Sequence, residues 1–112
     1  MAKKKSLNKK VENQVLKYLD FIKKKGFKLD KAIVFGSHTK GAPKKWSDID
    51  LCLISKRFKG DDFEDSVKLS TFAYDLGFFI EPHLFDPQEF QNKYDPLAEE
   101  IRKYGIEVKY PS

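Results

Sequence analysis

The sequence predicts a single α/β (α+β) domain in which helices pack on a small mixed β-sheet. Segments with helical spacing of apolar residues alternate with short runs of strand-forming residues, in the order αβ(α)βαβααβ. Glycine, proline or aspartate marks most of the boundaries between these segments. The length of 112 residues suits one domain, and ten Phe, five Tyr and one Trp supply bulky side chains for its core.

The first half of the chain is expected to hold one long helix and two strands. Apolar residues at helical spacing predict a helix over 7–25 that ends at Gly26, and its apolar positions are Val11, Val15, Leu19 and Ile22. Residues 31–35 are strand formers that end at Gly36. Residues 48–54 alternate between two faces of a second strand, with Asp48, Asp50 and Cys52 on one face and Ile49, Leu51 and Leu53 on the other.

The second half is expected to hold three helices and two further strands. A helix opened by Asp61 and Asp62 ends at Gly77, and its predicted apolar face is Phe63, Val67, Thr71 and Tyr74. A strand follows over 78–85. Two helix starts come next, Asp86–Glu89 and Asp95-Pro96, the second with an apolar stripe of Leu97, Ile101 and Tyr104. Gly105 closes that helix before a final edge strand over 106–110.

The formal net charge of +5 is unevenly distributed. Residues 1–31 hold 11 Lys and 3 acids, whereas the remainder holds 11 Lys or Arg and 14 acids. We expect residues 1–6 to be a flexible basic tail and residues 7–112 to be one domain. No aromatic residues interleave with the lysines of the tail, so nucleic acid is not expected to be a direct specific partner.

The composition also bears on the cellular compartment. No run approaches the roughly 18 apolar residues of a membrane span, and the lysine-rich start lacks the apolar stretch of a signal peptide. The single cysteine, Cys52, excludes an intramolecular disulfide and a cysteine-based zinc site. These features predict a soluble cytoplasmic protein without a membrane partner.

The segment from Gly36 to Asp50 carries the chemically informative residues. Gly36 allows a ligand to approach the backbone, and Ser37 can cap a short helix whose free amide groups would bind phosphate. Lys40 would add positive charge there. Asp48 and Asp50 point to the same face of their strand, roughly 6–7 Å apart along the backbone, which suits one or two Mg²⁺ ions that carry a nucleoside triphosphate.

Two other interpretations of this segment were weighed. Paired aspartates on a strand usually belong to a solvent-facing edge, but here they follow a strand that ends in Gly36-Ser37. Gly36 and Gly41 have the spacing of a Walker A loop. That loop requires Lys-Ser or Lys-Thr next, where this chain has Ala42-Pro43, so the Walker A interpretation fails.

The pattern Gly36-Ser37, the gap and Asp48-Ile-Asp50-Leu resembles the polymerase-β-type nucleotidyltransferase superfamily, and most of all its minimal nucleotidyltransferases. The resemblance implies a palm-like fold and transfer of a nucleoside monophosphate from a triphosphate, AMP from ATP in the first instance. It also implies that the Gly-Ser turn holds the triphosphate and that three carboxylates hold two Mg²⁺ ions. Glu81 is the candidate third acid, where the family more often has aspartate, and Lys40 stands where arginine is commoner.

The resemblance also implies a partner. Minimal nucleotidyltransferases of this kind resemble one half of two-gene systems whose other half is a helical HEPN protein, on which the transferase acts as an antitoxin, by binding it or by AMPylation. A non-catalytic binding antitoxin and a small-molecule, aminoglycoside-type transferase remain alternatives, and a homo-oligomer stays open. His38 and His83 are candidates for nucleotide or substrate contact. Trp46 is expected to pack near the turn, and Cys52 to belong to the core rather than to act as a nucleophile.

Overall fold

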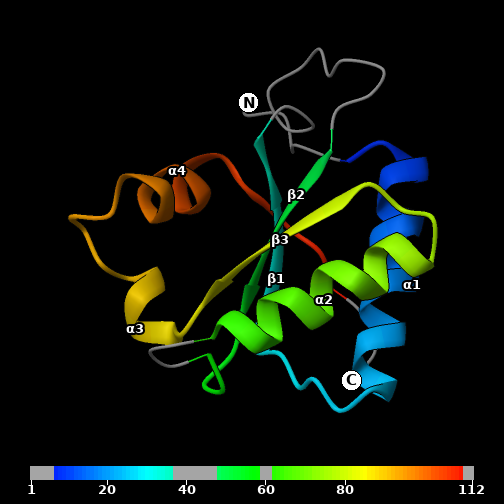
Figure 1. Ribbon diagram of the computed structural model, residues 1–112. Coiled ribbons are helices and arrows are strands. Elements are labelled where there is room, and N and C mark those ends of the chain that lie inside the picture. Colours follow the sequence, from blue (N-terminus) through cyan, green and yellow to red (C-terminus); the bar gives the residue numbers. More distant parts are fainter. Residues whose placement is uncertain (1–6, 37–47, 59–61, 110–112) are drawn as a thin grey trace.

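The computed structural model describes residues 7–36, 48–58 and 62–109. Figure 1 shows the order of the helices and strands along this part of the chain. They are α1 (Lys9–Lys24), β1 (Lys31–Phe35), β2 (Ile49–Ile54), α2 (Phe63–Asp75), β3 (Ile80–Phe85), α3 (Pro87–Phe90), α4 (Pro96–Tyr104) and β4 (Ile106–Glu107). The order matches the sequence prediction. The predicted basic tail and the short helix expected after Ser37 lie outside the described residues.

The four described strands form one mixed sheet in the order β3-β2-β1-β4. β1 runs antiparallel to both β2 and β4, whereas β2 and β3 are parallel. Pro82 lies in β3, an edge strand of this sheet, as its missing amide donor predicts. The predicted mixed α/β architecture is therefore confirmed.

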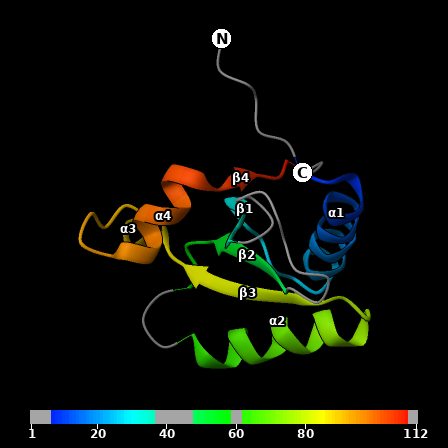
Figure 2. The same cartoon turned by 90° about the horizontal axis from the view of Figure 1, so that it is seen from above.

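Helices cover both faces of the sheet (Figure 2). Alternate strand residues on one face, among them Val34 and Leu51, form a core with buried residues of α1 and α2. The opposite face forms a second core with α3 and α4. That second core consists of Ile33, Phe35, Cys52, Ile54, Phe85, Phe90, Ala98 and Ile101. The face of β2 that carries Asp50 is thus apolar farther along the strand, so the carboxylate is confined to one end of it.

The ends of the helices follow the predicted capping residues. The side chain of Asp86 accepts a hydrogen bond from the Glu89 amide at 2.7 Å, and the Glu89 carboxylate accepts one from the Asp86 amide at 2.9 Å, a complete capping box. Asp95 caps α4 without a reciprocal bond, because its side chain accepts from the amides of Leu97 and Ala98 in the first turn. Gly26 ends the turn after α1 with φ +97°, where the Phe27 amide donates to the Ile22 carbonyl at 3.0 Å.

The predicted apolar face of α2 is wrong. Phe63 and Tyr74 are 71% and 83% exposed, and Val67 and Thr71 are exposed as well. The helix instead buries Leu69 and Ala73, with Phe72 and Leu76 packed against the same core. The stripe predicted for α4 is also partly wrong, because Ala98 and Ile101 are buried whereas Leu97 and Tyr104 remain exposed.

Contacts with α1 and the turn that follows it determine which face of α2 is buried. The ring of Phe72 packs edge-to-face against Phe21 and Phe27, with centroids 5.4 and 6.3 Å apart. The buried Tyr18 hydroxyl donates to the Leu69 carbonyl at 2.8 Å. Burial raises the pKa of the Tyr18 hydroxyl, so the group keeps its proton and remains a donor. The helical spacing of residues, on which the prediction rested, does not contain information about these contacts.

Two strands are shorter than predicted. The strand expected over 78–85 begins at Ile80, because Phe78 and Phe79 belong to the connection after Gly77. The strand expected over 106–110 comprises Ile106 and Glu107, which pair with β1 at the sheet edge. Residue 110 lies outside the described part.

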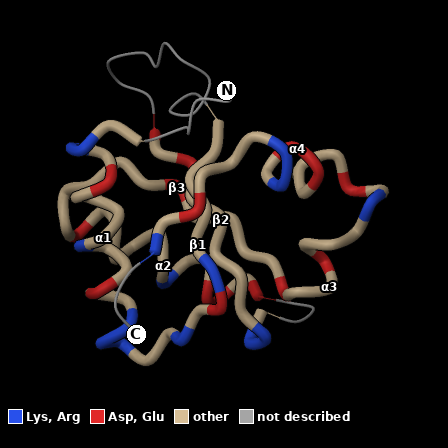
Figure 3. Tube along the Cα trace, turned by 180° about the vertical axis from the view of Figure 1, so that it is seen from behind, with Lys and Arg blue, Asp and Glu red and all other residues tan. Residues whose placement is uncertain are grey.

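Charged residues of both signs lie on the helices on the two sides of the sheet (Figure 3). In α1 the lysines occupy exposed positions, whereas Val15, Tyr18, Leu19 and Ile22 are buried, as the helical spacing predicts. None of the helices in the described part of the chain combines the length and apolar character that crossing a bilayer requires.

Candidate active site

The strand directions bring three chain segments together at one end of the sheet. The end of β1 and the starts of β2 and β3 lie at the same end of the sheet, because β1 is antiparallel to β2 and β2 is parallel to β3. In this register Asp50 is opposite Phe35 on one side and opposite Glu81 on the other. Residues more than 30 positions apart in the sequence therefore carry neighbouring carboxylates.

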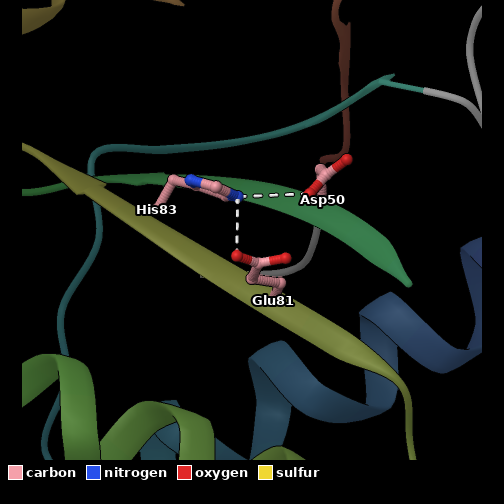
Figure 4. Close-up of side chains that lie close together, drawn as sticks. All are labelled: Asp50, Glu81 and His83. Atoms are coloured by element: carbon pink, nitrogen blue, oxygen red, sulfur yellow. Dashed lines mark hydrogen bonds and ion pairs between the residues drawn. The ribbon is translucent and has the colours of Figure 1, made fainter. Parts of the chain in front are cut away.

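Asp50, Glu81 and His83 form a compact polar group on this end of the sheet (Figure 4). Nε2 of His83 lies 3.2 Å from Oδ1 of Asp50 and 4.0 Å from Oε1 of Glu81. One potential ligand atom from each residue lies within 4.8 Å of the others. The side chains of Asp50 and His83 are 28% and 25% exposed, whereas that of Glu81 is 57% exposed. The group is thus half-buried but open to solvent on the Glu81 side.

Apolar side chains pack on the opposite face of the sheet from this group and against the imidazole of His83. The neighbours of Asp50 along β2, Ile49 and Leu51, point into the opposite core and are buried. The ring of Phe35 contacts the imidazole of His83 edge-to-face, with centroids 5.0 Å apart. These contacts hold β2 and the imidazole in place, so the polar group depends on the packing of both faces of the sheet.

Cys52 is buried and lies directly opposite His83 in the β2–β3 register. Burial raises the pKa of its thiol to about 12, so the sulfur stays protonated near neutral pH. A protonated, inaccessible thiol is neither a nucleophile nor a metal ligand. The sequence prediction that Cys52 belongs to the core is confirmed.

Gly36 ends β1 in a conformation that requires glycine. Its φ is +81°, in the left-handed region that other residues rarely adopt. A Cβ atom placed on Gly36 would collide with Oδ2 of Asp50, and would lie 3.3 Å from Cγ of the same residue. The backbone of the turn therefore touches the carboxylate itself. From the sequence, Gly36 is expected to allow a ligand to approach the backbone; the structure adds this contact with Asp50.

The structure brings some of the predicted site residues together and leaves others apart. Asp50 and Glu81 lie side by side, whereas Asp48 is exposed just before β2 and is not a member of the three-residue group. Asp86, the next acid along the chain after Glu81, caps α3, as the predicted helix start implies. The remaining candidates of the turn lie outside the described residues, namely Ser37, His38, Lys40 and Trp46.

The sequence analysis left the role of His83 open and did not predict its contact with Asp50. The signal was the two-residue spacing of Glu81 and His83, which places both side chains on one face of β3. Only the parallel register with β2 shows that this face meets Asp50.

The donor set fits a divalent cation. Two carboxylates and an imidazole converge from two adjacent strands, and carboxylate oxygens are the ligands that Mg²⁺ takes in phosphate-transfer sites. The chemistry of such a site is electrostatic, since a bound cation neutralises charge that develops on phosphate oxygens. The described residues thus include a set of donors whose chemistry suits a divalent cation.

Comparisons with known proteins agree with this geometry. Residues 12–110 match the family model described as a nucleotidyltransferase domain. No curated protein sequence matches the chain. Among solved structures, a toxin-antitoxin crystallised with AMP-PNP is similar, with a TM-score of 0.60 and 22% identity over 90% of this chain and 74% of that chain. A mutant of the toxin-antitoxin MntA-HpeT has a TM-score of 0.58 and 20% identity, again over 90% and 74% of the two chains.

These two similarities, at 20–22% identity, show that the chain shares the fold of those structures. The family match spans most of the chain, including Gly36, Asp50 and Glu81. From the family model, which matches most of the chain, together with the site on β2 and β3, the chain belongs to the nucleotidyltransferase domain family and is a nucleotidyltransferase.

Proposed function

We propose that this nucleotidyltransferase transfers AMP from ATP, in the presence of Mg²⁺, to a hydroxyl group of a partner protein. The observation that carries the proposal is the β2–β3 register, which sets the carboxylates of Asp50 and Glu81 side by side. Gly36 supports it, because its backbone lies against the Asp50 carboxylate and needs the absence of a side chain. A triphosphate and its metal ions would then occupy the same end of the sheet.

Each candidate residue has a role in this proposal. Asp48 and Asp50 hold Mg²⁺, and Glu81 holds a second ion or takes the proton of the acceptor hydroxyl. Gly36, Ser37 and Lys40 hold the triphosphate, with the glycine admitting it and the lysine adding charge. The acceptor oxygen would form a bond to the α-phosphorus of ATP as the bond to the β-phosphate breaks and pyrophosphate leaves, and Mg²⁺ held by these acids would stabilise the negative charge that develops.

The two similar solved structures favour a protein as the acceptor. Both similar structures are toxin-antitoxin proteins, and one was crystallised with the ATP analogue AMP-PNP. We therefore propose a toxin protein as the partner, of the helical HEPN class that the sequence resemblance implies. The chain would act as the antitoxin half of such a pair, within the cytoplasm.

Two alternatives keep the same fold. A non-catalytic antitoxin would bind the toxin without modifying it, and an aminoglycoside-type enzyme would modify a small molecule. The pairing of Asp50 with Glu81 favours catalysis over binding alone, because a binding surface has no need for converging carboxylates beside a glycine turn.

The acceptor can be identified by co-expressing the chain with the protein encoded next to its gene. We expect intact-mass spectrometry to show AMP added to that neighbour after incubation with ATP and Mg²⁺, and not with the Asp50→Asn variant. A stable complex without added mass would favour the binding antitoxin. AMP on an aminoglycoside, with an unmodified neighbour, would favour the small-molecule enzyme.

A side chain at Gly36 should disrupt nucleotide binding. In Gly36→Ala the new Cβ collides with the Asp50 carboxylate, so the carboxylate must move and the turn must leave its position. We expect the affinity for Mg²⁺ and a non-hydrolysable ATP analogue, measured by calorimetry, to fall about tenfold or more, which corresponds to roughly 1.4 kcal/mol.

Gly77→Ala is the matched control for this substitution. Gly77 has a similar φ of +75°, but nothing lies within 4 Å of a Cβ placed there. Both variants carry the same backbone strain of about 1–2 kcal/mol in the free energy of unfolding, so strain alone does not separate them. Unchanged nucleotide affinity in Gly36→Ala would mean that this turn does not hold the triphosphate.

A further inference from the structure

The imidazole of His83 is turned toward the carboxylates rather than toward solvent (Figure 4). His83 and Glu81 share one face of β3, and the register with β2 brings that face beside Asp50. Contact with Phe35 on one side fixes the ring, while Nε2 faces both carboxylates. A nitrogen donor thus stands in a site where the oxygen donors already suffice for Mg²⁺.

We propose that Nε2 of His83 is itself a metal ligand, so that Asp50, Glu81 and His83 bind a first-row transition ion such as Mn²⁺ in preference to Mg²⁺. This inference deepens the proposed function. It rests on the proposed function only in assuming that the ion bound here also takes part in nucleotide transfer. The binding of the ion is a separate property of these three side chains.

The distances fit a shared ion. A metal at about 2.1 Å from each donor requires that no two donors lie more than about 4.2 Å apart. Nε2 of His83 meets this limit with both carboxylates, at 3.2 Å from Asp50 and 4.0 Å from Glu81, and the donor atoms of the whole group lie within 4.8 Å of one another, so a small movement of one carboxylate would complete the site. Glu81 is the most exposed of the three residues, so its side chain has freedom to adjust to the ion. Cys52, the nearest softer donor, is excluded by burial of its thiol.

The ligand types decide which ion is preferred. Mg²⁺ takes oxygen ligands in a near-ideal octahedron and gains little from an imidazole. First-row transition ions accept imidazole nitrogen as well as carboxylate oxygen, and their affinities for mixed nitrogen and oxygen sites follow the Irving–Williams order. A site of two carboxylates and one histidine therefore shifts selectivity away from Mg²⁺.

One competing arrangement uses the same contact. His83 could donate a hydrogen bond to Asp50 from outside the ligand shell and merely orient the carboxylate. Loss of such a partner also weakens metal binding, typically by about 10- to 100-fold. Affinity for one metal cannot separate the two arrangements, but direct detection of a coordinated nitrogen can, and so can a comparison of two metals.

The test uses Mn²⁺ with the full-length protein in the absence of nucleotide. We expect pulsed electron paramagnetic resonance to show coupling of Mn²⁺ to an imidazole nitrogen, and calorimetry to give a higher affinity for Mn²⁺ than for Mg²⁺. His83→Gln keeps an amide that can donate to Asp50, yet it should abolish the nitrogen coupling and lower the Mn²⁺ affinity about tenfold or more. Its Mg²⁺ affinity should change little.

His38→Gln is the matched control, because it removes the chain's other histidine and should retain the nitrogen coupling. Absence of the coupling in the parent protein, or equal losses of Mn²⁺ and Mg²⁺ affinity in His83→Gln, would overturn the inference. If transfer still requires Asp50 in that case, the proposed function stands and only the role of His83 is wrong. If Mn²⁺ shows the nitrogen coupling but the protein has no transfer activity, His83 is a metal ligand and the proposed function is wrong.

Discussion

Replacing Asp50 by Asn should lower Mg²⁺-dependent nucleotide transfer by roughly 10²-fold or more. Asparagine keeps the shape of the side chain but removes the negative charge beside Glu81 and Gly36 that would hold the cation in the proposed site. The loss falls on stabilisation of charge in the transition state. The fold should persist, because the Asp50 side chain is part-exposed and lies at the edge of the second core rather than within it.

Asp48→Asn should act in the same direction, although Asp48 lies outside the three-residue group of the structure. Asp75→Asn serves as the control, since Asp75 is an exposed aspartate at the end of α2. Transfer rates and the free energy of unfolding should be measured for all three variants. Parental rates in both Asp50→Asn and Asp48→Asn would overturn the assignment of these residues to the metal.

Glu81→Gln should lower turnover strongly while leaving the binding of Mg²⁺-ATP nearly intact. Asp48, Asp50 and the triphosphate can hold one ion without Glu81. Activation of the acceptor hydroxyl needs a further negative group, and Glu81 is the acid of β3 that reaches this end of the sheet. A group used only in the chemical step lowers the rate rather than the affinity.

Asp86→Asn is the control for this prediction, because Asp86 caps α3 and accepts from the Glu89 amide. Asparagine is also a good capping residue, so a small change in stability and unchanged turnover are expected. Binding and turnover should be measured side by side for both variants. Full activity in Glu81→Gln together with loss in Asp86→Asn would mean that the third acid was assigned to the wrong residue.

The starts of α3 and α4, the end of α1 and the strand face of Asp50 were predictable because local chemistry determines them, whereas the start of β3 and the end of β4 differ from the prediction. Asp86 and Asp95 cap helices wherever those helices pack, and Gly26 ends a helix by its own backbone freedom. Alternation along β2 likewise assigns Asp50 to one face without knowledge of the rest of the fold. Strand pairing then placed Glu81 beside Asp50, as the family pattern implied.

The faces of α2 and α4 were not predictable in the same way. α2 carries two apolar stripes, and neighbouring elements decide which one is buried. In α4, Ile101 is buried together with Ala98 rather than with Leu97 and Tyr104. The ring of Phe72 packs against Phe21 and Phe27 at the core. In this orientation of the helix, Phe63 and Tyr74 are exposed. The contact of His83 with Asp50 and that of Gly36 with the same carboxylate depend on strand register, a long-range property that no local pattern records.

The central claim is that the carboxylates of Asp50 and Glu81 support transfer of a nucleotidyl group, and labelled ATP tests it most directly. The chain and its neighbour-encoded partner should be incubated with Mg²⁺ and ATP labelled on the α-phosphate or on the γ-phosphate. We expect stable label on protein from the α-phosphate alone, and none in the Asp50→Asn variant. Label from the γ-phosphate, or α-label that persists in Asp50→Asn, would contradict the account.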